Sequence, residues 1–355
     1  MDDLNQNPKL GSADRPNSYI GRSVPRERAK KLLEGKGKYV DDILLPRMVH
    51  LSYVRSPFAH AKIKSINTEN AKKIPGVLNV FTIDDIEKVC SPWQGVLGHL
   101  GEMRSPTQYP LAKDVVRWQG EPVAVVVANK RAVAEDASEL VEIDYEDLDA
   151  QLDMETAMDK STKVIHDDLG NNLFWTRTVN QGDVSEAFKQ SHIVEEVTLD
   201  FARHTGVTLE TRAIVADWDS SEERMTIYHN GQAPHMMQSI IAKHLNISEG
   251  LVRIISCDVG GSFGIKVHVY PDEMVTVAVS KLLKRPVKFV ADRLESYSTD
   301  IHSRCHKISG KIGVDDKGKI LAFEIDDLSG IGPFSVYPRT SAIETNQVLN
   351  LSAAS

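Results

Sequence analysis

The sequence has few cysteines, no excess of positive charge and no long hydrophobic run. Its three cysteines, Cys90, Cys257 and Cys305, are widely separated and odd in number, so they predict no disulfide framework and fit a reducing cytoplasm. The formal net charge of −8 argues against nucleic acid and an anionic membrane surface as partners, because both attract basic patches. No apolar stretch reaches the roughly 18 residues of a transmembrane helix, and no apolar N-terminal segment predicts a secretory signal. We therefore expect a soluble cytoplasmic protein.

Several motifs of common enzyme classes are also missing. There is no G-x-S-x-G nucleophile elbow. The glycine-rich stretch near residue 260 is neither a P-loop, because Val267 follows Lys266 where Ser or Thr is needed, nor a dinucleotide fingerprint, because its glycine spacing differs. His302, Cys305 and His306 could imitate a metal site, but three potential ligands without a fourth partner favour ordinary surface or interface residues.

The length of 355 residues predicts two to three domains. Residues 1–18 are rich in Asn, Asp, Pro and Gly and predict a flexible arm. A mixed α/β pattern occupies residues 39–152 of a first region at 19–152, and a linker rich in Asp, Thr and Asn follows at 153–172. Residues 173–355 form a second region, whose last residues, NQVLNLSAAS, look like a chain cut inside a domain.

The first region combines strands and a helix. The run PVAVVVA at 122–128 is typical of a strand that is buried on both faces. Asn129 is a suitable cap for a helix through Leu140, and the next strand at 141–145 would complete a βαβ-like unit. Further strands are predicted at 48–54, 61–66 and 77–83.

The second region has the same mixed character. Helices are predicted at 234–245 and 271–283, where Pro234 and Pro271 suit a first helical turn. Strands are predicted at 192–199, 214–217, 225–229, 251–259 and 286–291, with a hairpin at 307–312 and 320–327. The whole pattern predicts an α+β fold.

The loop from Asp258 to Lys266, with the sequence DVGGSFGIK, is the most informative stretch. Glycines between a strand and a helix let the backbone approach a ligand closely and direct N–H groups at an anion. The same pattern also fits a tight strand-to-helix turn without any ligand. The residues by themselves leave both interpretations open.

A family resemblance distinguishes these interpretations. The segment Gly260–Lys266 resembles the G-G-x-F-G-x-K loop of the xanthine dehydrogenase/aldehyde oxidase/CO dehydrogenase family. Gly231–His235 resembles the glutamine motif of that family, and Arg285–Lys288 with Asp292–Arg293 resembles its R-P-V-K…D-R segment. Glu210–Arg212 stands where the family has Glu-Pro-Arg and departs from it at the middle residue.

Motifs in the first region resemble the same family. Gly35–Asp42, Arg55–Ala61, Ile74–Val77 and Gly120–Ala124 are similar to its α/β-hammerhead domain, and the resemblance runs in order over about residues 19–350. It implies an α/β-hammerhead domain at 19–152, followed by part of the molybdenum-cofactor-binding α/β domain. Residues 173–355 would be the first molybdopterin-binding domain, truncated or split at its C-terminus.

The resemblance also implies the roles of five residues. The side-chain amide of Gln232 would lie near the apical oxygen of molybdenum. The backbone of Gly261, Ser262, Phe263 and Gly264 would face the metal and the pterin, and the Phe263 ring would form a wall of the substrate pocket. Because the pterin dithiolene holds the metal in this family, no protein side chain is implied as a direct metal ligand.

The implied activity is that of a molybdenum hydroxylase, which oxidises an aldehyde, an aromatic heterocycle or CO with water as the oxygen source. The catalytic glutamate of the family is expected on a missing half, so no catalytic residue is assigned to this chain. The implied partners are a C-terminal molybdopterin-binding chain, an iron–sulfur subunit with 2Fe-2S clusters and an FAD subunit. The cofactor would be molybdopterin in its dinucleotide form.

Two questions stay open at this stage. The purine-hydroxylating members have a glutamate after the loop lysine, where this chain has Val267, so purines are disfavoured relative to small-molecule substrates of the other members. The alternative to an enzyme component is a non-catalytic truncated remnant or an assembly protein that retains the fold.

Overall fold

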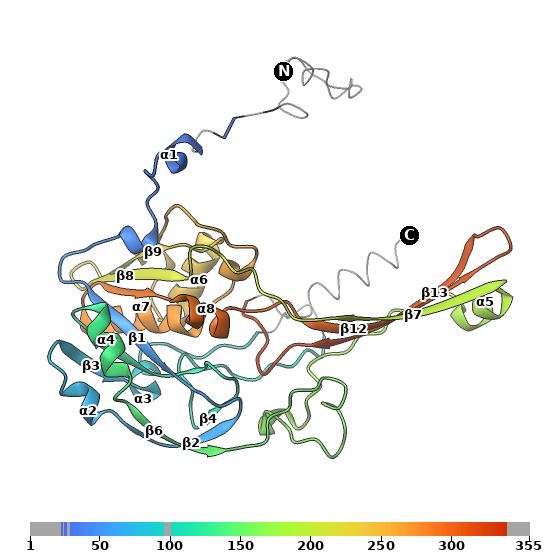
Figure 1. The fold of residues 1–355 in the computed structure, drawn as a ribbon, viewed down its shortest axis with the longest axis horizontal. Helices are drawn as coiled ribbons and strands as arrows, with labels where there is room; N and C mark the ends of the chain where they lie inside the picture. Colours follow the sequence, from blue (N-terminus) through green and yellow to red (C-terminus); the bar gives the residue numbers. More distant parts are fainter. Residues whose placement is uncertain (1–22, 24, 27–28, 96–100, 339–355) are drawn as a thin grey trace. The chain divides into compact units, whose positions relative to one another are not determined.

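The computed structural model describes residues 23, 25–26, 29–95 and 101–338 (Figure 1). The chain divides into two compact units, 1–38 and 39–355. In the first unit, helix α1 (Ala29–Leu33) buries none of its residues. The predicted flexible arm at 1–18 lies outside the described residues. No helix in the described ranges is both long and apolar enough to cross a membrane.

A seven-stranded sheet forms the centre of the second unit, and it takes strands from both predicted regions. Its order is β10-β9-β8-β11-β1-β5-β3. Strands β1 and β11 are parallel neighbours with Val49 opposite Val287, so the two regions meet within one sheet. The linker predicted at 153–172 therefore does not separate two sheets. The predicted domain boundaries remain a prediction. The strands are β1 (Val49–Arg55), β3 (Val77–Phe81), β5 (Pro122–Ala128), β8 (Ala213–Asp219), β9 (Arg224–His229), β10 (Val252–Ser256) and β11 (Val287–Val290).

The burial of strand β5 explains the continuous apolar run PVAVVVA in the sequence. All seven of its residues are buried. Val125 and Val127 join the large core that also contains residues of α7 (Pro271–Leu283), whereas Ala124 and Val126 join a smaller core beneath α4 (Arg131–Ser138). Because successive side chains of a strand point to opposite faces, a strand that is covered on both faces must be apolar at every position.

Two long helices, α6 (Pro234–His244) and α7, contact the seven-stranded sheet. Helix α7 contacts β8 and β11, and its residues from Asp272 to Ser280 are all buried. Helix α6 contacts β10, and both helices carry the expected proline in the first turn. The short elements are α2 (Glu69–Lys72), α3 (Ile83–Ile86), α8 (Arg293–Thr299), and the 3-10 turns η2 (Val40–Asp42), η3 (Asp167–Leu169), η4 (Glu249–Leu251) and η5 (Ile265–Val267).

Two three-stranded sheets complete the second unit. In the first, β2 (Ala61–Asn67) lies between β4 (Val115–Val116) and β6 (Glu142–Asp147). The predicted βαβ-like unit is wrong, because β6 pairs antiparallel with β2 and not with the sheet that contains β5.

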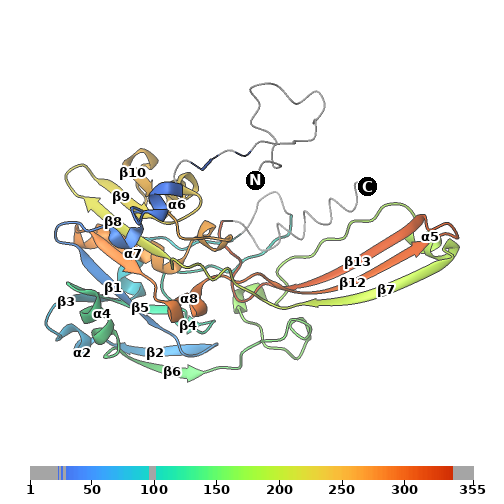
Figure 2. The same cartoon turned by 45° about the horizontal axis from the view of Figure 1, so that its top comes forward.

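In the other sheet, β12 lies between β7 and β13, as Figure 2 shows. Helix α5 contacts β12 and β13 at this sheet. The elements are α5 (Val184–Gln190), β7 (Ile193–Phe201), β12 (Cys305–Val314) and β13 (Ile320–Gly330).

Three local predictions need correction. Asn129 does not cap α4, whose N-cap is Lys130; the Asn129 N–H instead donates to the Gly76 carbonyl at 2.9 Å. The predicted strand at 77–83 ends at Phe81, because Thr82 begins α3 with a capping box. The strand predicted at 251–259 ends at Ser256, so Cys257 follows the strand and is only partly buried.

Candidate functional site

The glycine loop Gly260–Lys266 connects the end of β10 to η5 and then to α7. Gly261 and Gly264 have φ angles of +104° and +91°, a region in which a side chain would be strained. Phe263 has φ +50° although it carries a side chain, and 78% of its surface is exposed. From its residue type alone, Phe263 would be expected in the hydrophobic core. Its exposure is therefore unusual for a phenylalanine.

Glu210 holds both ends of the glycine loop. Its Oε2 atom accepts a hydrogen bond from the Gly260 N–H at 2.7 Å and lies 3.1 Å from the Lys266 Nζ atom. The Glu210 N–H also donates to the Gly260 carbonyl at 3.1 Å. Burial lowers the pKa of the Lys266 ammonium, and the Glu210 carboxylate opposes that shift. The side chain of Lys266 is 1% exposed, so its charge is paired inside the protein.

Gln232 lies beside the glycine loop, as the sequence motifs imply. Its backbone N–H donates to the Lys266 carbonyl at 2.9 Å. Gly231 precedes it in a crowded place, where a Cβ atom would lie 2.3 Å from the ring of His229. The Gln232 side chain is exposed, just before the first residue of α6. The structure thus brings two segments together, and the role of the amide remains a prediction.

Several backbone donors of the glycine loop form no hydrogen bond with the described residues. Within the described ranges, the N–H groups of Gly261, Ser262, Phe263 and Gly264 form no hydrogen bond, and neither does the Gln232 amide. Ser262 is used internally, since its Oγ accepts from the Lys266 N–H at 3.2 Å. Four backbone donors and one neutral amide suit a ligand rich in oxygen and negative charge, so these residues fit a pterin cofactor with an oxygen-bearing metal.

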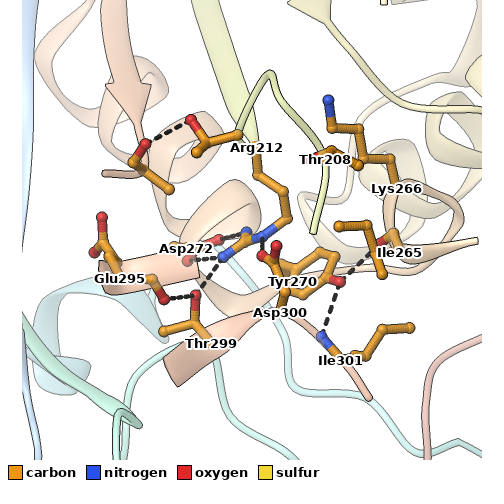
Figure 3. Close-up of polar contacts among 12 residues, drawn as sticks. Thr208, Arg212, Ile265, Lys266, Tyr270, Asp272, Glu295, Thr299, Asp300 and Ile301 are labelled. Atoms are coloured by element: carbon orange, nitrogen blue, oxygen red, sulfur yellow. Dashed lines mark hydrogen bonds and ion pairs between the residues drawn. The ribbon is translucent and has the colours of Figure 1, made fainter. Parts of the chain in front are cut away.

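A buried ionic network lies beneath the loop (Figure 3). Arg212 is 0% exposed, and its guanidinium donates to Asp300 Oδ1 at 2.6 Å and to Asp272 Oδ1 at 2.6 Å. The guanidinium carbon lies 3.7 Å from the centre of the Tyr270 ring. The Tyr270 hydroxyl donates to the carbonyl of Ile265 at 2.7 Å, which connects this network to the glycine loop.

Arg55 extends this network to the first of the two predicted regions. From the end of β1, its Nη2 atom donates to Asp272 Oδ2 at 2.9 Å and its Nε atom to Glu295 Oε1 at 2.7 Å. Burial raises the pKa of the Asp272 carboxyl, but the guanidiniums of Arg212 and Arg55 outweigh it and hold that pKa below its ordinary value. Asp272 is therefore charged and shared by two arginines.

Local sequence patterns do not predict this network. Pro271 indicates the start of α7, but no motif marks Asp272, Tyr270 or Asp300 as partners of Arg212. The Asp-x-x-Glu pattern of Asp292 and Glu295 could have predicted α8, because it forms the capping box of that helix. No local pattern connects Arg212 to partners that lie 60 and 88 positions along the chain.

Two features of the sequence receive a structural explanation. Thr211 replaces the proline that the family has in Glu-Pro-Arg, and its hydroxyl donates to the Ala291 carbonyl at 2.6 Å. Around Cys305, the possible metal ligands have other contacts: His306 Nδ1 lies 2.9 Å from Asp327 Oδ1, and Cys305 Sγ lies 3.6 Å from Met154 Sδ. Within the described ranges, no group of three His, Cys, Asp or Glu side chains could hold a metal ion.

Comparisons with known proteins match both regions. The profile of the molybdopterin cofactor-binding domain matches residues 165–353. The profile of the a/b hammerhead domain of aldehyde oxidase and xanthine dehydrogenase matches residues 34–149.

Individual relatives agree with these profiles. The nicotine 6-hydroxylase large subunit of Paenarthrobacter nicotinovorans is 36% identical over 95% of this chain and 41% of its own length. The carbon monoxide dehydrogenase large chain of Hydrogenophaga pseudoflava is 32% identical over 87% of this chain and 40% of its own length. The crystal structure of quinoline 2-oxidoreductase from Pseudomonas putida 86 has a TM-score of 0.87 and 31% identity, over 91% of this chain and 41% of that chain. The chain thus spans about two fifths of the length of these relatives.

Proposed function

This chain belongs to the xanthine dehydrogenase/aldehyde oxidase/CO dehydrogenase family, with a hammerhead domain followed by a molybdopterin-binding domain, and we propose that it is the cofactor-binding component of a molybdenum hydroxylase. One observation carries the proposal. The glycine loop, whose N–H groups from Gly261 to Gly264 form no hydrogen bond among the described residues, is joined to the segment of the exposed Gln232 by the bond from the Gln232 N–H to the Lys266 carbonyl.

The residues of the site would bind and orient the cofactor. The N–H groups of Gly261, Ser262, Phe263 and Gly264 and the Gln232 amide would donate hydrogen bonds to it without adding a group that titrates. Phe263, exposed beside these donors, would form a wall of the substrate pocket. When bound, molybdopterin supplies a molybdenum centre that carries out the two-electron oxidation of the substrate with oxygen from water.

The remaining parts of the activity are proposed from the family. The base that takes a proton during substrate oxidation is expected outside this chain, in a partner with the second half of the cofactor site. Partner subunits with 2Fe-2S clusters and FAD would accept the electrons, and the dinucleotide form of molybdopterin and a cytoplasmic location remain predictions. We propose an aldehyde, an aromatic heterocycle or CO as substrate, since Val267 stands where purine-hydroxylating members have a glutamate.

Metal and pterin analysis tests this proposal. The tagged chain, purified with its partners from its native host, should contain molybdenum and release a fluorescent oxidised pterin. Gln232→Ala should reduce both contents, whereas Gln190→Ala, an exposed glutamine of α5, should leave them unchanged. The chain without partners should not reduce a dye with any of the three substrate classes. A complex devoid of molybdenum and pterin would favour the non-catalytic alternative, and turnover by the isolated chain would contradict the placement of the base.

A further inference from the structure

A single carboxylate oxygen of Glu210 is shared by the two ends of the glycine loop. Oε2 accepts from the Gly260 N–H at 2.7 Å and binds the Lys266 ammonium at 3.1 Å. Between these two contacts lie Gly261–Ile265, the stretch that includes the four N–H groups without a hydrogen bond among the described residues. Because a hydrogen bond to a charged group is shorter and stronger than a neutral one, this oxygen constrains both ends at once.

Further contacts between Glu210 and Gly260 restrict the movement of the Glu210 side chain away from the glycine loop. Its own N–H donates to the Gly260 carbonyl at 3.1 Å, so the two residues are joined through both backbone and side chain. A Cβ atom on Gly260 would lie 2.4 Å from the Glu210 Cβ, so the close approach requires glycine there. The second oxygen, Oε1, is buried with no hydrogen-bond partner among the described residues. All the polar contacts of the carboxylate group thus pass through Oε2.

The same contact extends to the second cofactor segment. The carbonyl of Lys266 accepts from the Gln232 N–H at 2.9 Å, so a displacement of Lys266 would also displace Gln232. Lys266 itself is 3% exposed, and without Glu210 its ammonium would lie buried and unpaired. Glu210 thus contacts the two ends of the glycine loop directly and is connected to Gln232 through Lys266.

We propose that Glu210 is a positioning residue of the cofactor site, which fixes the distance between Gly260 and Lys266 and so sets the direction of the loop N–H groups. Glu210 does not itself touch the cofactor. The positioning role is a property of this chain by itself, whereas its effect on cofactor binding rests on the function proposed above.

Hydrogen–deuterium exchange of the full 355-residue chain tests the positioning role directly. In Glu210→Gln, exchange of the Gly260 amide and the loop peptide should be at least about tenfold faster, because a bond to a charged acceptor is lost. Peptides from β5 and α7 should keep their wild-type exchange. The conservative Glu210→Asp should fall between the two, since its shorter side chain keeps the charge but cannot reach both partners.

A control is available at the other buried lysine, whose carboxylate partner is 67% exposed. Lys288 is 4% exposed and its Nζ atom lies 3.1 Å from Asp41 Oδ1, the same distance as in the Lys266 pair. Asp41→Asn should leave exchange in the glycine loop unchanged. If Glu210→Gln unfolds the whole chain, Lys266→Gln repeats the test from the other end, since it leaves the bond between Gly260 and Glu210 intact. Wild-type loop exchange in either Glu210→Gln or Lys266→Gln would overturn the proposal.

Molybdenum content separates this inference from the proposed function. In the complex, Glu210→Gln should lose more than half of the bound molybdenum, while Asp41→Asn should lose none. Faster loop exchange together with a wild-type complex that binds no molybdenum would leave the positioning role standing and refute the proposed function. Full molybdenum content with unchanged loop exchange in Glu210→Gln would refute the positioning role and leave the proposed function standing.

Discussion

The two ends of the seven-stranded sheet are stabilised by different kinds of contact. At the β5 end, strands and helices are held by apolar burial, and Glu121 is the one buried Asp, Glu, Lys or Arg among the described residues from 39 to 152. At the end that carries the glycine loop, buried charged side chains are concentrated near that loop. They are Arg212, Lys266, Asp272, Glu273 and Asp300.

The two kinds of contact contribute differently to the free energy of folding and to the precise placement of the glycine loop. Apolar burial stabilises without specifying direction, so β5 needs only side chains of suitable size. Buried ion pairs lose much of their attraction to desolvation, but each pair is favourable in only one geometry. Our hypothesis is that the charged end fixes where the glycine loop lies, and that the apolar end supplies the free energy of folding.

The largest effect is expected at the centre of the charged end. Arg212→Met should lower the free energy of unfolding by about 3–5 kcal/mol, because Asp300 loses its guanidinium partner and Asp272 keeps only Arg55. Urea unfolding at neutral pH measures this change. Arg224→Met, at an exposed ion pair with Glu222, should change it by less than about 0.5 kcal/mol. A loss below about 1 kcal/mol for Arg212→Met would show that the network does not organise this end.

A pH-dependent effect is expected at the apolar end. Burial raises the pKa of Glu121 from 4.5 to about 7, against the opposing hydrogen bond from the Arg117 N–H. A raised carboxyl pKa means that the neutral form is favoured in the folded chain. Its contribution to stability is therefore complete below pH 4.5 and is lost as the pH rises through about 7.

The comparison of Glu121→Gln with wild type measures this contribution. Between pH 4.5 and 8, wild type should lose roughly 3 kcal/mol of stability relative to the variant, from a shift of about 2.5 pKa units. Thermal melts across this range provide the measurement. His166, whose pKa burial lowers to about 4, acts in both proteins and cancels in the difference. Parallel stability curves for the two proteins would show that Glu121 is ionised in the folded chain.

The sequence predicted most of what is local in this fold and little of what is distant. The bounds of α7 and β5 were predicted as the structure has them, because their apolar patterns and first-turn residues are local signals. The pairing of β6 with β2 could not be predicted, since half-exposed strands of similar composition can pair in several ways. In the site, the family resemblance implied that Gln232 and the glycine loop face the same cofactor, but the Arg212 network arises only from tertiary contacts.

The smallest effect on stability is expected at Phe263, which neither end of the sheet buries. The residue is 78% exposed and its φ is +50°, so Phe263→Ala should change the free energy of unfolding by less than about 0.5 kcal/mol. Phe263→Gly should raise it by up to about 1 kcal/mol, since glycine adopts this backbone conformation without strain. Urea unfolding distinguishes these outcomes.

A loss above about 1 kcal/mol in Phe263→Ala would instead assign the ring to the core. With stability unchanged, both variants should still weaken substrate binding in the active complex, which would appear as a raised KM. Phe263 would then mark a third kind of residue in this fold, kept exposed at a strained backbone position for the ligand and not for the stability of the chain.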